Sequence, residues 1–322
     1  MNLKSFKYSN ILTLSATITF VVCGVFGFFD SSMIEIVVAA ILIIAVGLPH
    51  GATDLLLVKY LSTDRYNEQN VSQALLHYIS LIVLYGLIWY FMPELAFVLF
   101  IIISIYHFGQ SNYTFLQVES KLTRTVGYIA SGSFVLLTPL CIHHEIAIPI
   151  IETISGTTAF SFSATTAETL TRALFLTNIW LLIFLYLNNW ITSETLAYQL
   201  VSIVLLLLCY WFLPLILGFT IYFVFWHSLH SMVDQIDYIR TKENDFTWLK
   251  YYKNALPITL LAVILIAGGY WINITWSINF SIIEVFFVML SLMTLPHIIL
   301  IEQLYANFKQ VSTITVRQLV KD

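Results

Sequence analysis

Five histidines of this chain occupy apolar stretches of sequence, where an ionisable side chain is costly and is often functional. Several neutral imidazoles without a thiolate or carboxylate among them suit zinc, copper or ferrous iron. A lone histidine of this kind is more often a hydrogen-bonded interfacial residue than a ligand, but that reading weakens for five together. His227 and His230 are three residues apart, so on a helix their Cβ atoms would be about 5 to 6 Å apart on one face. We therefore expect a metal site made from His50, His107, His227, His230 and His297.

A proline directly precedes two of the histidines, in the segments Leu48–Asp54 and Leu295–Glu302. Proline breaks the helical hydrogen-bond ladder, so each helix is expected to bend there. A carboxylate follows each histidine about one turn later. If the first helix continues, Asp54 could accept a hydrogen bond from His50 and orient it, because ligating imidazoles usually donate their other N–H to a carboxylate or carbonyl. A solvated acid at the membrane interface is the alternative for Asp54.

His107 lies in the segment Tyr106–Gln110. Gly109 allows another backbone to approach closely. Gln110 lies on the same side of the helix as His107, three residues further on. We therefore expect Gln110, like Asp54, to support the site.

The elements that position these residues are predicted to be membrane-spanning helices. The 322 residues are 59% hydrophobic and 10% charged, whereas a soluble domain carries about 25% charged residues. At about 20 apolar residues a span, the chain can form roughly eight to ten spans and no separate soluble domain. We predict an all-α polytopic membrane bundle, a single domain over residues 1–322. The ten apolar runs have approximate cores at 10–29, 33–50, 72–91, 94–109, 125–142, 171–189, 196–212, 214–230, 256–272 and 281–301.

The number of spans leaves an alternative open. The fourth, seventh and eighth runs are short, and Pro214 could be a kink within one longer helix, so eight or nine spans are possible. Cytoplasmic segments are enriched in Lys and Arg. With ten spans and the N-terminus inside, every basic residue except Arg172 falls on the cytoplasmic side: Lys4, Lys7, Lys59, Arg65, Lys121, Arg124, Arg240, Lys242, Lys250, Lys253, Lys309, Arg317 and Lys321.

This alternation predicts a multi-pass protein of the cell inner (cytoplasmic) membrane with both termini cytoplasmic. The histidines would then meet at the cytoplasmic ends of the even-numbered helices. A catalytic ion reached through apolar walls implies a lipid-soluble substrate that enters from the bilayer. Aromatic residues beside the histidines would line its slot, and we expect these to be Tyr106, Phe108 and Trp226.

Composition excludes two other classes. The net charge is −4, and no basic run interleaves with aromatic residues, so nucleic acid is not an expected partner. The three cysteines, Cys23, Cys141 and Cys209, stand singly, without the C-x-x-C spacing of a zinc or redox site, so a cysteine-based zinc or redox protein is the second excluded class. They are expected to be inert packing residues.

Four motifs, taken together, resemble the Brp/Blh family of β-carotene 15,15′-dioxygenases, in the family's order and over nearly the whole chain. The resemblance implies an integral-membrane, Fe(II)-dependent enzyme that uses O2 to split the central double bond of β-carotene into two molecules of all-trans retinal. In microbes the retinal typically serves a rhodopsin, which is therefore an implied partner. The motifs are Leu48-Pro49-His50-Gly51 with Asp54, Tyr106-His107-Phe108-Gly109, Trp226-His227-Ser228 with His230, and Pro296-His297.

The resemblance implies that His50, His107 and His227 are iron ligands. His230 is the fourth candidate, but the family spaces this pair four apart with an arginine before the second histidine. Here the spacing is three and Leu229 precedes His230. His297 could fill the fourth position instead. Asn112 stands where the resemblance leads us to expect an acid after His107-Phe108-Gly109. No catalytic residue beyond the metal ligands is required.

Three other functions remain as alternatives. A bis-histidine haem electron-transfer protein would place histidine pairs on facing helices and show a Soret band. Another membrane non-haem iron oxygenase or desaturase acting on a lipid would need about eight histidines in dense boxes. A metal transporter would place its ligands at the bilayer midplane rather than at one face.

Overall fold

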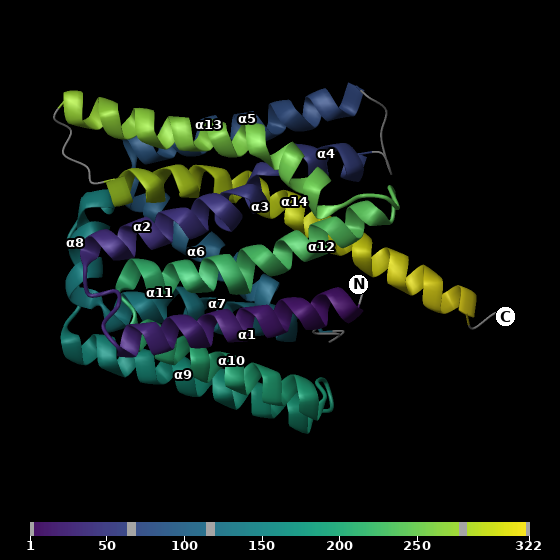
Figure 1. The fold of residues 1–322 in the computed structure, drawn as a ribbon, viewed down its shortest axis with the longest axis horizontal. Coiled ribbons are helices and arrows are strands. Elements are labelled where there is room, and N and C mark those ends of the chain that lie inside the picture. The colour runs from purple at the N-terminus through teal and green to yellow at the C-terminus, as the bar shows by residue number, and fades with distance from the viewer. Residues whose placement is uncertain (1–2, 63–68, 114–119, 277–281, 320–322) are drawn as a thin grey trace. The chain divides into compact units, whose positions relative to one another are not determined.

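The computed structural model describes residues 3–62, 69–113, 120–276 and 282–319 (Figure 1). These residues form helices, with no strand in the part described. Within it, ten helical segments are long and apolar enough to cross a membrane, which confirms the predicted all-α, multi-pass membrane fold. The segments are Tyr8–Val25, Ser32–Leu61, Ser72–Phe91, Pro93–Asn112, Lys121–Ile142, Ala164–Leu187, Ser193–Phe212, Leu215–Arg240, Trp248–Thr275 and Ile282–Asn307.

The short seventh and eighth runs are separate helices. Helix α10 (Ser193–Phe212) ends before Pro214, and α11 (Leu215–Ile221) begins after it. Leu213 is extended, as steric contact with the ring of the next proline favours. Pro214 therefore directly precedes a helix as its N-cap residue, where the absence of its N–H costs little. The eighth span continues through η2 (Tyr222–Ser228), a π-helix, into α12 (Leu229–Arg240).

The chain divides into two compact units. The first consists of Met1–Leu3, Leu48–Met92 and Ser231–Asp322. In it, α3 packs against α13, and α14 packs against α4 and α5. Its helices, besides most of α12, are α3 (Leu48–Ala52), α4 (Asp54–Ser62), α5 (Gln69–Phe91), α13 (Trp248–Thr275) and α14 (Ile282–Leu319).

The second unit consists of Lys4–Gly47 and Pro93–His230. In it, α7 packs against α6, α9 and α10, and α11 packs against α2. Its elements, besides α10, α11 and η2, are α1 (Leu3–Val25), α2 (Ser32–Leu42), the π-helix η1 (Ile43–Gly47), α6 (Pro93–Asn112), α7 (Lys121–Ile142), α8 (His144–Ser155) and α9 (Ala164–Leu187).

Two glycines explain how closely α6 and α7 approach. A Cβ atom added at Gly109 would lie 1.7 Å from the carbonyl oxygen of Tyr128, and one added at Gly132 would lie 1.7 Å from that of Ile105. Any other residue at either position would push the two helices apart. The close backbone approach expected at Gly109 is therefore confirmed, and it fixes the helix that carries His107.

Local sequence sets where several helices begin. A side-chain oxygen just before the helix accepts a hydrogen bond from the backbone N–H three residues later, which satisfies an amide that has no partner within the helix. The capping residues are Ser120, Ser163, Thr192 and Thr247.

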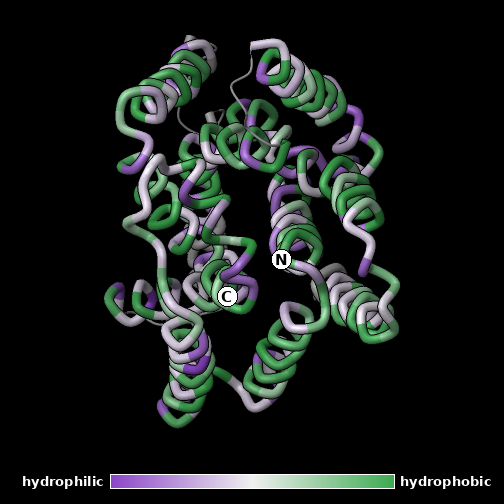
Figure 2. Tube along the Cα trace, turned by 90° about the vertical axis from the view of Figure 1, so that its left-hand side faces the viewer, coloured by the Kyte–Doolittle hydropathy of each residue, from purple (hydrophilic) through white to green (hydrophobic). Residues whose placement is uncertain are grey.

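Apolar residues dominate along the helices (Figure 2). Many large apolar side chains are exposed, as contact with lipid requires.

Two expectations stay predictions. One is that residues 1–322 form a single domain, and the other is that both termini face the cytoplasm. Of the basic residues on which the orientation depends, Arg65 and Lys321 lie outside the described residues.

Candidate metal centre

Each unit contains one pair of buried histidines. In the first unit, the rings of His50 in α3 and His297 in α14 have centroids 4.7 Å apart and lie at 78° to each other. In the second, the rings of His107 in α6 and His227 in η2 are 4.8 Å apart at 76°. All four residues are 5% exposed or less. In each unit, two histidines that are far apart in sequence thus have their imidazole rings in contact.

The histidines lie inside helical segments rather than at their ends, where the sequence placed them. The four segments that carry them continue to Leu61, Asn112, Arg240 and Asn307. The apolar runs stop near the histidines because buried polar residues follow, such as Asp54 and Gln235. These polar residues find partners inside the protein, so the helices do not have to stop there.

Two irregularities bracket His50. The π-helix η1 precedes it, next to Pro49, which has no N–H to donate to the carbonyl four residues earlier. After it, the helix is interrupted at Thr53, so α4 starts afresh at Asp54. Such π-helical insertions are frequent at functional sites because they change the direction in which side chains point.

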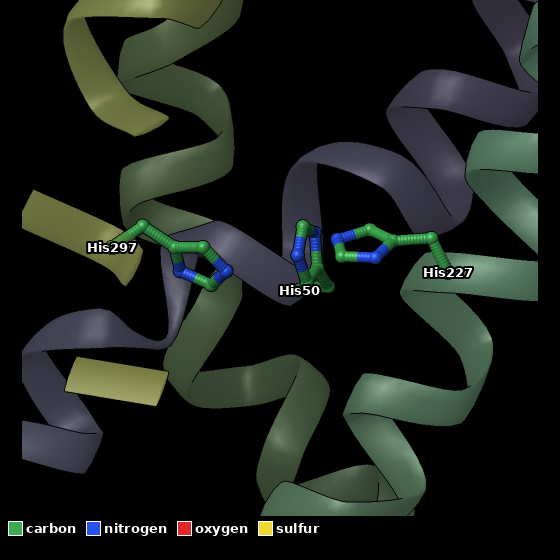
Figure 3. A group of neighbouring side chains, drawn as sticks. All are labelled: His50, His227 and His297. Carbon is green, nitrogen blue, oxygen red and sulfur yellow. The ribbon is translucent and has the colours of Figure 1, made fainter. Parts of the chain in front are cut away.

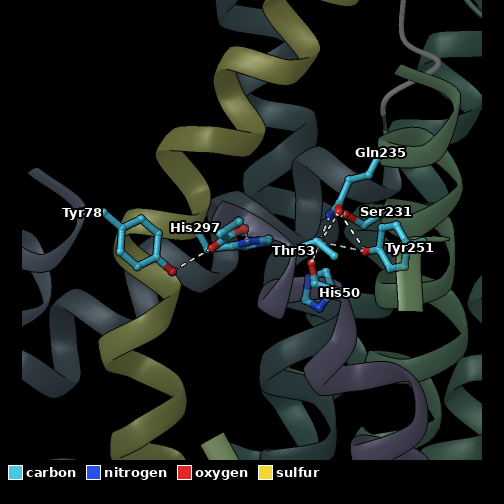
Figure 4. A network of polar contacts seen from close by, with 8 residues as sticks. His50, Thr53, Tyr78, Ser231, Gln235, Tyr251 and His297 are labelled. Atoms are coloured by element: carbon cyan, nitrogen blue, oxygen red, sulfur yellow. Dashed lines mark hydrogen bonds and ion pairs between the residues drawn. The ribbon is translucent and has the colours of Figure 1, made fainter. Parts of the chain in front are cut away.

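The interruption at Thr53 changes the partner of Asp54. One carboxylate oxygen accepts a hydrogen bond from Nδ1 of His297 at 2.7 Å, and the other accepts one from the hydroxyl of Tyr78 at 2.8 Å (Figure 4). The sequence predicted that Asp54 would accept a hydrogen bond from His50 if the helix continued. Because the helix breaks, the partner in the structure is His297.

A second set of hydrogen bonds fixes the backbone at His50 (Figure 4). The amide of Gln235 donates to the carbonyl oxygen of His50 at 3.2 Å, and the hydroxyl of Thr53 lies 3.0 Å from the same oxygen. The hydroxyl of Tyr251 donates to Oε1 of Gln235 at 2.9 Å and lies 2.9 Å from that of Thr53. Gln235 also donates to Ser231 at 3.2 Å. Helices α12 and α13 thus hold the turn that carries His50.

Aromatic rings surround the histidine pair of the second unit. Phe108 meets the His227 ring edge-on, with centroids 4.9 Å apart, and Phe223 stacks on it at 5.7 Å. Gly47 makes room for Phe223, because a Cβ there would lie 2.8 Å from its ring. The surroundings of this pair are therefore apolar.

His230 is held by protein partners on both ring nitrogens. Nδ1 lies 3.1 Å from the carbonyl oxygen of Phe225, and Nε2 lies 2.8 Å from Oδ1 of Asn10. The hydroxyl of Thr13 donates to the same carbonyl of Phe225 at 2.9 Å. The carbonyl oxygen of Phe225, in the π-helix η2, thus has two side-chain partners, and both ring nitrogens of His230 lie within hydrogen-bond distance of other protein atoms.

The other residues expected at the site have different surroundings. Tyr106 packs against Tyr128, with ring centroids 5.7 Å apart, and Trp226 donates its Nε1–H to Thr17 at 3.0 Å. Gln110 is buried in α6. Of the three aromatic residues expected to line a slot, Phe108 contacts a histidine of these pairs, with its ring centroid 4.9 Å from that of His227.

His50, His227 and His297 form a buried group that could hold a metal ion, each offering one ring nitrogen (Figure 3). His107 lies against His227. A donor set of imidazoles in buried surroundings fits a borderline transition-metal ion such as Fe(II) or Zn(II) and does not fit a hard ion such as Mg(II) or Ca(II).

Sequence reasoning missed the residues that support the histidines: Thr53, Tyr78, Phe223, Gln235 and Tyr251. One signal was available. Ser231 and Gln235 are four residues apart on the helix that follows His227, and two polar residues on one face of a membrane helix tend to face other helices. Nothing in the local sequence distinguishes Tyr78 or Tyr251 from the other tyrosines of the chain.

Comparison with known proteins gives one consistent result. A family model described as beta-carotene 15,15′-dioxygenase matches residues 41–305, a range that contains all four paired histidines. A protein named beta-carotene 15,15′-dioxygenase, from an uncultured marine bacterium, 66A03, is 25% identical over 290 residues, which cover 83% of this chain and 93% of that protein. No solved structure matches the chain. The match over most of the chain shows that it belongs to the β-carotene 15,15′-dioxygenase family.

Proposed function

We propose that this protein cleaves β-carotene at its central 15,15′ double bond with O2 and releases two molecules of all-trans retinal. Fe(II) would be held by His50, His107, His227 and His297. The observation that carries the proposal is the presence of four buried, paired histidines within the residues that match the family. The reaction balances without a further reductant, because one C=C bond breaks and each half gains one oxygen atom of O2 as an aldehyde.

Fe(II) held by these histidines would supply the one-electron chemistry that lets O2 react with a polyene. The imidazoles would hold the ion while leaving coordination positions open, as non-haem oxygenases require. No protein group needs to move a proton, because neither substrate nor product gains or loses one. This agrees with a site whose proposed ligands are all imidazoles.

The aromatic residues of the second unit would exclude water and accept the polyene. Phe108 and Phe223 contact the His227 ring, and both are buried. β-Carotene has no polar group near its central bond, so shape and apolar contact would have to select the bond that is cleaved. The substrate would enter from the bilayer, in keeping with a multi-pass membrane protein.

The test is expression in a bacterium that accumulates β-carotene, with retinal measured by chromatography. We expect loss of carotene and appearance of retinal as the C20 aldehyde, without longer apocarotenals. Absence of retinal from a well-expressed, iron-replete protein would overturn the proposal. A Soret band in the purified protein would instead support the haem alternative, because non-haem iron gives none.

We further propose that the protein resides in the cytoplasmic membrane. A rhodopsin that receives the retinal remains a prediction from the family resemblance. Pull-down from a retinal-producing cell, with and without the rhodopsin chain, would test that partner separately from the cleavage activity.

A further inference from the structure

We propose that Asp54 is a positioning residue for His297: its carboxylate takes the Nδ1–H of the imidazole and so makes Nε2 the atom that binds the metal. The proposal rests on the metal site of the proposed function and deepens it. It concerns three elements of the first unit, α4, α5 and α14, whose residues are far apart in sequence (Figure 4).

The hydrogen bond selects one tautomer of His297. A carboxylate only accepts, so Nδ1 must carry the proton at the 2.7 Å contact with Asp54. In a neutral ring the lone pair is then on Nε2. Metal-binding imidazoles in proteins usually have their other N–H held in this way, which fixes both the tautomer and the ring orientation.

Tyr78 fixes the second oxygen of the carboxylate. Its hydroxyl donates to Oδ2 of Asp54 at 2.8 Å, while Oδ1 faces His297. With each oxygen bound to a different helix, the carboxylate cannot rotate without losing a hydrogen bond. Asp54 therefore transmits the position of α4 and α5 to a histidine of α14.

The buried charge of Asp54 has a physical reason in this arrangement. The residue is 2% exposed, and a buried carboxylate is costly unless it is compensated. Asp54 lies in the first turn of α4, where the backbone amides and the helix dipole favour a negative charge. A metal cation bound to His297 would compensate it further, so metal binding and the buried carboxylate would stabilise each other.

The experiment measures Fe(II) affinity rather than turnover. The full chain is purified in detergent, loaded without oxygen, and titrated with a competing chelator. For Asp54→Ala we expect Fe(II) binding weaker by about 10- to 100-fold, the usual effect of removing such a partner. Asp54→Asn keeps the size and one acceptor oxygen but loses the charge, so its affinity for Fe(II) should lie between those of the wild type and Asp54→Ala. Tyr78→Phe leaves the carboxylate in place and should lose less than Asp54→Ala.

A second tyrosine–carboxylate pair of the same unit is the matched control. The hydroxyl of Tyr305 donates to Asp234 at 3.1 Å. Asp234→Asn and Tyr305→Phe should keep the wild-type Fe(II) affinity. The visible spectrum of the Co(II)-loaded protein, which reports ligand geometry, should change in Asp54→Ala and stay unchanged in both controls.

The outcomes separate the two proposals. If Asp54→Ala and Asp54→Asn bind Fe(II) as the wild type does and give its Co(II) spectrum, the positioning role is wrong, whatever their thermal stability. If the wild type binds Fe(II) but makes no retinal, the cleavage activity is wrong, and the effect of Asp54 on affinity still decides its role. A wild-type protein that binds no Fe(II) would overturn both.

Discussion

At the scale of single residues, an imidazole can bind a metal only through a ring nitrogen that carries a lone pair. His50, His107, His227 and His297 are buried among helices, and two ring contacts of less than 5 Å pair them. His230 differs, because both of its nitrogens have protein partners. The distinction leads to opposite predictions for substitutions only three residues apart.

Alanine at each of the four paired histidines is predicted to reduce both bound iron and retinal formation by at least about 100-fold, since an open-sided site loses affinity steeply with each ligand. Iron is measured by a colorimetric assay on the purified protein, and retinal by chromatography. His144→Ala is the control and should keep both, because His144 lies at the start of α8 and belongs to neither histidine pair. A variant that loses activity while retaining all its iron would remove that histidine from the ligand set.

His230→Ala is predicted to retain iron but to lower the free energy of unfolding by about 1 to 3 kcal/mol, because it leaves the carbonyl of Phe225 and the amide of Asn10 with fewer buried partners. Thermal unfolding in detergent, alongside the iron content, checks this. Loss of iron from a variant with unchanged stability would return His230 to the metal site.

At the scale of elements, contact between helices depends on small residues at particular positions. The carbonyl oxygen of Tyr128 lies where a side chain at Gly109 would begin, and α6 carries His107 two residues earlier. Packing of α6 on α7 therefore determines the position of a proposed ligand.

Gly109→Ala is predicted to lower the free energy of unfolding by about 3 kcal/mol or more, since the added methyl group meets backbone atoms that cannot rotate away. The midpoint of thermal unfolding should fall, and bound iron should fall with it. Gly268→Ala in α13 is the control, because a Cβ there meets nothing within 4 Å. Equal stability of the two variants would show that α6 can shift without cost.

The connection between α12 and α13 contains a small ionic cluster. Nζ of Lys250 lies 2.8 Å from Glu243 and 2.7 Å from Asp245, and Tyr60 also donates to Glu243. The hydrogen bond from Lys250 holds the pKa of each carboxyl below its ordinary value, 4.5 for Glu243 and 3.8 for Asp245. An acid with a lowered pKa stabilises the folded state above its ordinary pKa, and this contribution is lost as the pH falls through the lowered value.

We therefore predict that this connection loosens below about pH 4.5, near the ordinary pKa of Glu243. Amide hydrogen exchange over residues 241–247 should rise as the pH is lowered, after correction for the intrinsic rate. The effect should be small, because the groups are exposed and salt screens them. Lys250→Gln should remove most of the pH dependence, and an unchanged profile in that variant would contradict the assignment.

At the scale of the whole molecule, the ten apolar helical segments require a lipid environment. Large exposed side chains such as Phe26, Tyr90 and Trp276 would be unfavourable in water. The protein is predicted to stay with the membrane fraction after an alkaline carbonate wash and to leave it only with detergent. Release by carbonate alone would contradict membrane spanning.

The sequence predicted the spans well because their signal is additive. Each predicted core overlaps one of the ten segments of the structure. The sequence left open whether Pro214 is a kink within one longer helix, and the structure has separate helices on either side of it. Helix length was underestimated around the histidines. The predicted apolar runs end before the polar residues Asp54 and Gln235. In the structure these residues have buried hydrogen-bond partners, so the helices continue past them.

By itself, then, the sequence determined the fold class, a range of eight to ten spans and a set of candidate histidines, because apolar composition and local motifs act within a few residues of each position. Only the tertiary structure decided that Asp54 serves His297, that His230 is tied to Phe225 and Asn10, and that Gln235 and Tyr251 hold the turn at His50. These choices join residues up to 243 positions apart. They depend on which helices pack together and on where a helix is interrupted, and no short stretch of sequence contains that information.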